Sequence, residues 1–86
     1  MRLLITKCFD GDYKNLPRAI QEQCDKQLIA LLKNPRHPSL QTSKIHGIES
    51  IWEGRVSKDY RFSFQIAKDI YILRRVGKHD EVLRRP

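Results

Sequence analysis

The chain has 86 residues, of which 40% are hydrophobic and 31% charged, and its net charge is +7. These figures predict one small domain over residues 1–86 and exclude large multidomain enzymes and dinucleotide-binding folds. The apolar runs are only a few residues long, far short of the roughly 20 that cross a bilayer, so neither a signal peptide nor a membrane anchor is expected.

The first predicted elements are a short strand and an amphipathic helix. Residues 2–7 form an apolar run with β-branched members, and Asp10-Gly11-Asp12 behind it predicts a turn. Pro17 suits a first helical turn, and Asn34-Pro35 is expected to end the helix. The early part of the chain is therefore expected to be either a helical hairpin or a helix with a break at Pro17. Between them, spacings of three and four predict a buried stripe made of Leu16, Ile20, Cys24, Leu28, Leu31 and Leu32.

The second half of the chain predicts an antiparallel meander. Residues 36–49 show no sustained period and predict an irregular connection. Three β-rich runs follow at 51–57, 60–66 and 70–76, joined by the short polar links Lys58-Asp59 and Lys68-Asp69. Together the elements predict an α+β fold, with a helical hairpin on one face of a small twisted antiparallel sheet of about four strands.

Alternation along the middle β-rich run assigns its two faces. The aromatic members Tyr60, Phe62 and Phe64 share one face, which the helix is expected to cover, and this leaves Arg61 on the open face. The third run is apolar on both faces at its start and basic at its end, so alternation does not decide its facing.

The positive charge is concentrated in the last third of the chain. Residues 1–54 carry 8 Lys or Arg against 6 Asp or Glu, whereas residues 55–86 carry 9 against 4. Such a field attracts polyanions, which include nucleic acid and acidic proteins.

Two cysteines, Cys8 and Cys24, lie in apolar stretches and have no partner at metal-ligand spacing. We expect both thiols to be buried in a reduced protein, which favours a cytoplasmic location.

Several segments together resemble the RelE/ParE superfamily of toxins from toxin–antitoxin pairs. Beside the helix ends at Leu16-Pro17 and Leu31-Leu32-Lys33-Asn34-Pro35, they are Ile45-His46-Gly47, the run from Trp52 to Phe62 and the run from Val76 to Leu83. The resemblance implies a RelE-like fold, no cofactor, and a cognate antitoxin protein as partner. It also implies one of two activities, because RNA-cutting members cleave messenger RNA in the ribosomal A site and ParE-like members poison DNA gyrase.

Metal-free RNA cleavage needs a base for the ribose 2′-OH, cations around the phosphorane and an acid for the leaving 5′ oxygen. Arg61 resembles the strand arginine on which RNA-cutting relatives rely, and a guanidinium matches phosphate oxygens. His79 is expected on a loop end just past the last strand. It resembles the C-terminal histidine of YoeB-like and YafQ-like toxins, which makes it the expected acid. Asp80 would then orient the His79 ring.

Two residues are candidates for the base. His46 lies beside Gly47, where RNA-cutting relatives carry Lys, Glu or His, and Glu53 lies on a predicted strand. Glu53 has an alternative role, as an ion-pair partner that balances Arg55 or Arg61. Arg55 itself is assigned either to the phosphate or to such an ion pair.

Other basic residues are expected to contact RNA phosphates, namely Lys44, Arg74, Arg75, Lys78, Arg84 and Arg85. Arg84-Arg85-Pro86 is expected to form a solvated basic tail. No metal site is expected, because no His, Cys or carboxylate cluster has ligand spacing. Relatives place an aromatic residue shortly after the His-Asp pair, and this chain has Leu83 there.

The sequence therefore predicts a ribosome-dependent messenger RNA endonuclease that inhibits translation, with no metal or small-molecule cofactor and no membrane partner. Two alternatives remain open. One is a ParE-like gyrase inhibitor, and the other is a non-catalytic module that binds an antitoxin or nucleic acid.

Overall fold

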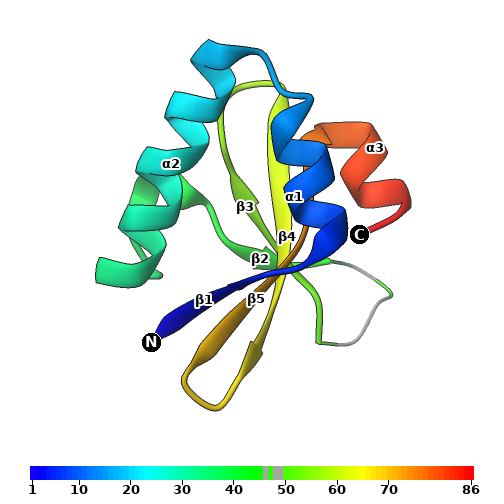
Figure 1. Ribbon diagram of the computed structural model, residues 1–86. Helices are drawn as coiled ribbons and strands as arrows, with labels where there is room; N and C mark the ends of the chain where they lie inside the picture. Colours follow the sequence, from blue (N-terminus) through cyan, green and yellow to red (C-terminus); the bar gives the residue numbers. More distant parts are fainter. Residues whose placement is uncertain (46, 48–49) are drawn as a thin grey trace.

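The computed structural model describes residues 1–45, 47 and 50–86. In chain order its elements are β1 (Arg2–Ile5), α1 (Lys7–Lys14), α2 (Arg18–Lys33), the 3-10 helix η1 (Pro38–Leu40), β2 (Ser43–Lys44), β3 (Trp52–Arg55), β4 (Tyr60–Ala67), β5 (Ile70–Lys78) and α3 (His79–Arg84). The strands form one sheet in the order β1-β5-β4-β3-β2 (Figure 1).

The predicted α+β class and the packing of two helices on the sheet are confirmed, but the prediction of about four antiparallel strands needs correction. The described residues form five strands, and β1 runs parallel to β5. After β1 the chain passes through α1 and α2 to the opposite edge of the sheet. The meander then returns through β3 and β4, so that β5 arrives beside β1 in the same direction.

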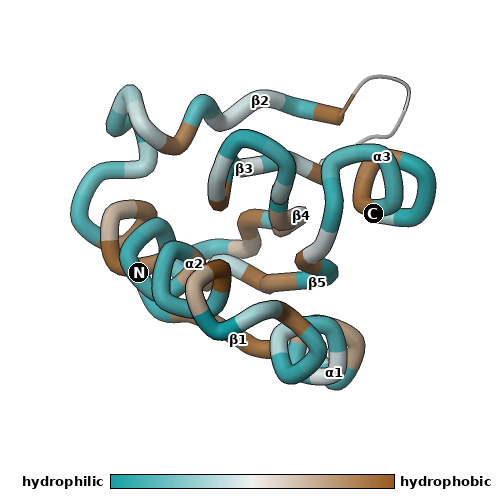
Figure 2. Tube along the Cα trace, turned by 90° about the horizontal axis from the view of Figure 1, so that it is seen from above, coloured by the Kyte–Doolittle hydropathy of each residue, from teal (hydrophilic) through white to brown (hydrophobic). Residues whose placement is uncertain are grey.

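The helices lie on different sides of the sheet. Seen along the strands in Figure 2, α2 lies on one side and α3 on the other, while α1 lies next to β1 and β5. We call the side that carries α3 the open face, because α3 has only six residues. The core fills the α2 side, where apolar residues of α1 and α2 pack against β3, β4 and β5.

The turn predicted at Asp10-Gly11-Asp12 is wrong, because these residues lie inside α1. Thr6 begins this helix as its N-cap, and the Thr6 hydroxyl accepts a hydrogen bond from the Phe9 N–H at 3.2 Å. Phe9 is buried in the core, and its ring stacks on that of Tyr13 one helical turn later. Burial of this face outweighs the turn preference of the Asp-Gly-Asp segment.

Helix α2 follows the prediction closely. Pro17 is its N-cap and the helix stops at Lys33, before Asn34-Pro35. Cys24, Leu28 and Leu31 are buried as expected, but Leu32 is 39% exposed. Successive helical residues differ by about 100° in direction, so Leu31 and Leu32 cannot both face the sheet.

An irregularity in the β4–β5 pair decides which side chains of the third β-rich run, now β5, face the core. The register shifts between Ser63 and Phe64, which pair with Arg75 and Leu73 and leave Arg74 as an extra residue. Residues on either side of this bulge can therefore face the core at an odd spacing, and Tyr71, Leu73 and Val76 are all buried. The bulge leaves both Arg74 and Arg75 for the open face.

Gly54 is the place where the sheet is most sensitive to an added methyl group. It lies directly opposite Phe62, and a Cβ at Gly54 would come within 2.6 Å of Phe62 Cε1 and closer still to Cζ. We expect Gly54→Ala to cost about 1–3 kcal/mol of unfolding free energy, because the Phe62 ring is fully buried and cannot move away. Thermal denaturation measures this as a fall of about 4–8 °C in Tm per kcal/mol.

Gly11→Ala is the matched control, since nothing lies within 4 Å of a Cβ at Gly11. It is expected to raise stability by up to about 1 kcal/mol, because alanine favours the helix. An unchanged Tm in Gly54→Ala would contradict the close packing of Gly54 on Phe62.

The two cysteines differ, which corrects the expectation that both are buried. Cys24 is fully buried, whereas Cys8 is exposed on α1, and both are free thiols. Burial, with a smaller contribution from the Asp25 carboxylate, raises the pKa of the Cys24 thiol from 9.0 to about 12. The folded state favours the protonated thiol, so its contribution to stability is present below pH 9.0 and is lost as the pH rises toward about 12.

We expect iodoacetamide to label native protein once, at Cys8, because only a thiolate that reagent can reach is alkylated. Mass spectrometry counts the labels. The Cys8→Ser variant should stay unlabelled when folded and take one label in denaturant. Labelling of native Cys8→Ser at a rate comparable with that of the wild type would contradict the burial of Cys24.

Candidate active site and nucleic-acid interface

The open face is organised by the pairing of β3, β4 and β5. Arg55 lies directly opposite Arg61, and Arg61 lies opposite Gly77. Strand ends differ slightly from those predicted, since β3 stops at Arg55 and residues 56–59 form the bend to β4. Like charges directly across a ladder repel one another, so the Arg55–Arg61 pair costs folding energy unless an anion lies nearby.

Arg61 is held by main-chain oxygens. Its Nη1 donates to the carbonyls of Ser57 at 2.6 Å, Tyr60 at 2.9 Å and Lys58 at 3.2 Å. No ion pair joins Arg61 or Arg55 to a carboxylate within the described part of the chain. The bend between β3 and β4 therefore fixes the Arg61 guanidinium without neutralising its charge.

His79 is the first residue of α3, where the sequence predicts a loop end. Its main-chain N–H donates to the Asp59 carbonyl at 2.8 Å, which continues the β4–β5 pairing by one step. The ring Nδ1 lies 3.1 Å from Asp80 Oδ1, so Nε2 is the ring nitrogen that is left to contact a ligand. The His79 side chain is 43% exposed, hence within reach of a ligand.

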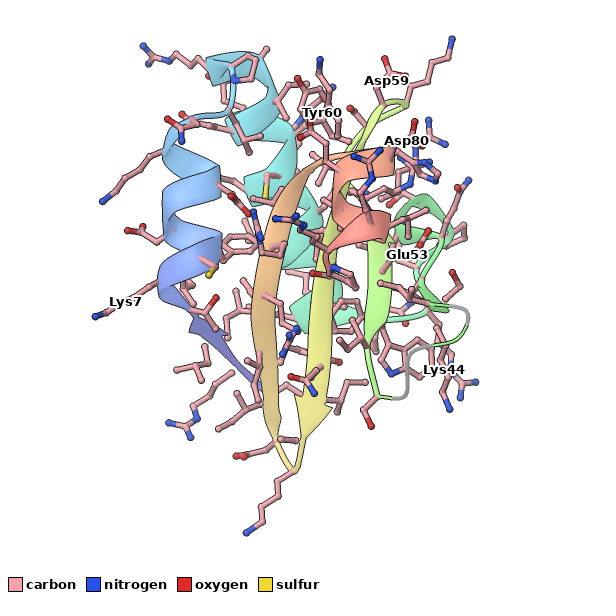
Figure 3. The ribbon with its side chains drawn as sticks, turned by 90° about the vertical axis from the view of Figure 1, so that its right-hand side faces the viewer. Lys7, Lys44, Glu53, Asp59, Tyr60 and Asp80 are labelled. Atoms are coloured by element: carbon pink, nitrogen blue, oxygen red, sulfur yellow. The ribbon has the colours of Figure 1, made fainter. Side chains whose placement is uncertain are left out.

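His79 lines an open hollow of about 670 Å³ at this end of the sheet. We call it the His79 hollow, and it is lined by Asp59, Tyr60, Lys78, His79, Asp80, Glu81 and Arg84. Figure 3 looks onto the open face and places Asp59, Tyr60 and Asp80 together at its upper end. Of the predicted phosphate contacts, Lys78 and Arg84 belong to this hollow.

Arg61 and His79 are brought to the same end of the sheet. Arg61 pairs with Gly77, and His79 follows Gly77 by two residues, so the two are diagonal neighbours across the ladder. Such neighbours are typically about 7–8 Å apart and share a face. Arg61 and His79 are therefore expected to lie near one another, although the two residues are distant in sequence.

The candidate bases are placed differently. Glu53 is half-buried on β3, opposite Ser63, and lies further down the open face in Figure 3. Alternation puts the Glu53 side chain on the same face as Arg55 and Arg61. His46 lies outside the described residues.

Lys44 does not join this group. It pairs with Trp52 at the β2 edge of the sheet, and its Nζ lies 5.5 Å from the centre of the Trp52 ring. Figure 3 places it on the right-hand side of the molecule, below Glu53 and away from Asp80. A cation over an indole face explains this position of Lys44 without an RNA contact.

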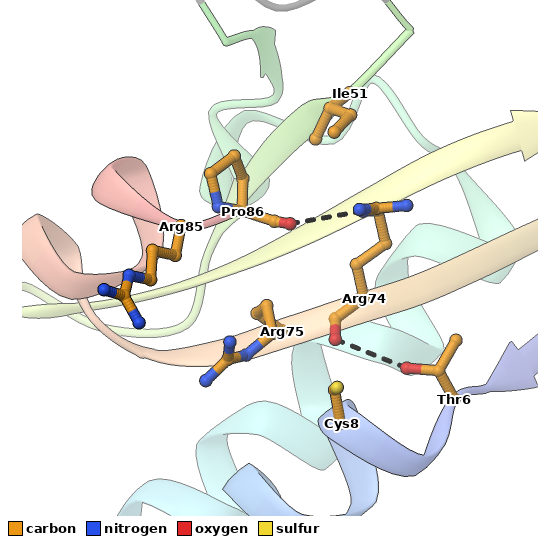
Figure 4. Close-up of a pocket in the computed structure, with 7 residues that line it drawn as sticks. All are labelled: Thr6, Cys8, Ile51, Arg74, Arg75, Arg85 and Pro86. Carbon is orange, nitrogen blue, oxygen red and sulfur yellow. Dashed lines mark hydrogen bonds between the residues drawn. The ribbon is translucent and has the colours of Figure 1, made fainter.

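The remaining predicted arginines surround a second hollow, of about 540 Å³, shown in Figure 4. We call it the arginine hollow, and it is lined by Thr6, Cys8, Ile51, Arg74, Arg75, Arg85 and Pro86. The segment predicted as a solvated tail instead ends against the sheet, because Arg74 Nε donates to the Pro86 oxygen at 3.2 Å. Arg74 Nη1 donates to Gln65 Oε1 at 2.7 Å.

Arg75 has a structural partner that sequence reasoning missed. Its Nε and Nη2 donate to the two carboxylate oxygens of Asp12, at 2.6 and 3.2 Å. Asp12 also accepts a hydrogen bond of 3.2 Å from the Val76 N–H. β1 pairs with β5 only as far as Leu73, so this N–H has no partner on β1. These hydrogen bonds, with the charge of Asp12, raise the pKa of Arg75 and fasten α1 to β5.

Tyr60 is a second residue that the sequence reasoning assigned elsewhere. It was expected in the core, and it does pack against the core, but it also lines the His79 hollow. Its position just before Arg61 is the signal that could have suggested this. Leu83, which stands where relatives carry an aromatic residue, is half-buried on α3.

Among the described residues, no group of three or more His, Cys, Asp or Glu side chains could hold a metal ion. Within the same residues, no helix is long and apolar enough to cross a membrane.

Comparison with known proteins relates this architecture to toxins of toxin–antitoxin pairs. No protein-family model and no curated protein sequence matches the chain. Several solved structures match over nearly their whole length. A copper-bound mutant toxin from Helicobacter pylori is 21% identical, with a TM-score of 0.75 over 95% of this chain and 98% of that one.

The toxin in the RelB–RelE antitoxin–toxin complex from Methanococcus jannaschii is 22% identical, with a TM-score of 0.76 over 94% and 95% of the two chains. YafQ from E. coli is 12% identical, with a TM-score of 0.78 over 93% and 94%. At these identities the likeness is one of fold. The chain has the fold of RelE-, YoeB- and YafQ-type toxins, as its sequence resemblance predicts.

Proposed function

We propose that this protein is the toxin of a toxin–antitoxin pair and that it cleaves messenger RNA in the ribosomal A site. The observation that carries the proposal is the placement of Arg61 and His79 at one end of the open face, beside a hollow. Metal-free phosphodiester cleavage requires a cation and a proton donor; within the described ranges Arg61 has no carboxylate partner, and the His79 imidazole is accessible.

In the proposed reaction, the ribose 2′ oxygen attacks the adjacent phosphorus after a base takes its proton. Glu53 or His46 is the base, and Arg61 with Arg55 binds the equatorial oxygens of the phosphorane. The bond from phosphorus to the 5′ oxygen then breaks, and His79 gives that oxygen a proton. The products are a 2′,3′-cyclic phosphate and a free 5′-hydroxyl.

Asp80 supports this assignment by its contact with His79 Nδ1. A carboxylate hydrogen-bonded to Nδ1 orients the imidazole ring. Because Asp80 is 89% exposed, its effect is expected to be small compared with that of His79.

Transcript ends, mapped after induction in cells, test the proposal. Wild-type protein is expected to produce breaks inside translated codons, and the Arg61→Ala/His79→Ala double variant is expected to produce none. Equal growth arrest by both proteins would argue against catalysis. DNA-damage signalling without loss of messenger would indicate the gyrase-directed alternative.

The proposed partner is a cognate antitoxin protein, since several proteins of this fold were solved in complex with their antitoxins. The net charge of +7 favours an acidic or amphipathic partner. Co-purification with the products of adjacent genes tests this expectation, and absence of binding by all of them would contradict it.

A further inference from the structure

We propose that the arginine hollow is a separate anion subsite, in which Arg74 and Arg85 bind a phosphate of the RNA strand next to the linkage that is cut. This inference rests on the proposed function, because it names how the same substrate is held. The three arginines of the hollow have different roles: Arg74 and Arg85 bind the phosphate, and Arg75 is a structural residue bound to Asp12.

The charge balance of the hollow is the first argument. Three guanidinium groups line it, and no described residue of its lining has an acidic side chain. Asp12 lies outside the lining and accepts two hydrogen bonds from Arg75. Arg75 and Arg85 also line a smaller hollow, of about 50 Å³, together with Asp12 and Glu81. Arg74 donates to an amide oxygen and to the Pro86 oxygen, and Arg85 has no ion pair with a carboxylate in the described ranges.

The cost of this arrangement is the second argument. The bulge in β5 places Arg74 beside Arg75, and α3 brings Arg85 to the same hollow from the end of the chain (Figure 4). Crowding of like charges opposes folding, and a bound anion removes that cost. A phosphodiester oxygen suits the site because a guanidinium offers paired donors to it.

The position of the hollow favours RNA over an acidic protein segment. It lies on the open face, which also carries Arg55 and Arg61. Arg74 and Arg75 are two to three residues from Gly77, the partner of Arg61, which corresponds to about 7–10 Å along β5. A single RNA strand bound at Arg61 would therefore pass close to the arginine hollow.

The test measures binding apart from cleavage. The probe is a single-stranded RNA oligonucleotide methylated on every 2′ oxygen, which cannot attack its own phosphate. Its dissociation constant is measured by fluorescence anisotropy across a series of salt concentrations. For single strands the slope of log K against log salt changes by about 0.7 for each phosphate contact.

Arg85→Gln and Arg74→Gln are each expected to reduce this slope by about 0.7 and to weaken binding similarly for all RNA sequences. Arg18→Gln is the matched control. Arg18 is an exposed arginine at the start of α2, beside Glu22, and its loss should leave the slope unchanged. Arg75→Gln is expected to lower the Tm, because it releases Asp12.

Unchanged slopes in both Arg74→Gln and Arg85→Gln, with Tm values near that of the wild type, would overturn the inference. A poly-glutamate peptide whose binding depends on Arg85, while RNA binding does not, would overturn it in favour of a protein-docking surface. Cleavage is not the readout. RNA binding that depends on Arg85 in a protein that never cuts RNA would therefore refute the proposed function alone.

Discussion

The His79→Ala variant is expected to cleave RNA about 10²–10⁴-fold more slowly than the wild type. His79 begins α3, its ring is accessible in the His79 hollow, and Asp80 contacts Nδ1. Without the imidazole the 5′ oxygen leaves as an unprotonated alkoxide, which is a poor leaving group. Single-turnover cleavage of messenger RNA on programmed ribosomes measures the chemical step directly.

Two further measurements separate proton donation from a structural role of His79. An acid must be protonated to act, so the wild-type rate should fall at alkaline pH and the variant should lack that fall. Added imidazole should restore part of the activity of His79→Ala. His37→Ala is the matched control, because His37 is an exposed loop histidine that contacts Ser39. Cleavage by His79→Ala at the wild-type rate would exclude His79 as the acid.

The Arg61→Gln variant is expected to lose about 10²–10³-fold in kcat, with a smaller effect on KM, because the phosphorane carries more negative charge than the substrate. The bend carbonyls hold the guanidinium in place before RNA arrives, so little reorganisation is needed. Arg61→Lys keeps the charge but lacks the planar fork, and its kcat should lie between those of Arg61→Gln and the wild type.

Arg36→Gln is the control for Arg61, since Arg36 is exposed in the connection after α2. The Tm of Arg61→Gln must also be measured, because Arg61 ties the bend at residues 57–60. A folded Arg61→Gln protein with wild-type kcat would remove Arg61 from the mechanism.

Much of the local structure follows from periodicity that can be seen in the printed sequence. The stripe at three- and four-residue spacing predicts α2, and Asn34-Pro35 predicts its end. Alternation predicts that Phe62 and Phe64 face the core and that Arg61 faces away from it, and both aromatic residues are buried. These features depend on neighbours in the chain, which is why a single sequence suffices.

The sequence-based predictions are wrong where contacts between distant segments decide the secondary structure. The Asp10-Gly11-Asp12 segment has turn residues, yet burial of Phe9 and the bonds from Asp12 to β5 keep it helical. Likewise, His79 was expected on a loop end, but α3 begins there because Val82 is buried against the sheet. Turn and loop preferences are worth about 1 kcal/mol, less than the burial of a large apolar side chain.

The sequence by itself determined the class of fold, the extent of α2 and the meander, because these depend on local spacing. Its resemblance to RelE/ParE toxins supplied Arg61 and His79 as candidates. Only the tertiary structure decided that β1 pairs in parallel with β5 and that Arg61 and His79 lie at the same end of the sheet. It also decided that Arg75 is hydrogen-bonded to the Asp12 carboxylate. Each of these needs the register between strands and helices far apart in the chain, and a one-residue bulge at Arg74 is enough to change which side chains share a face.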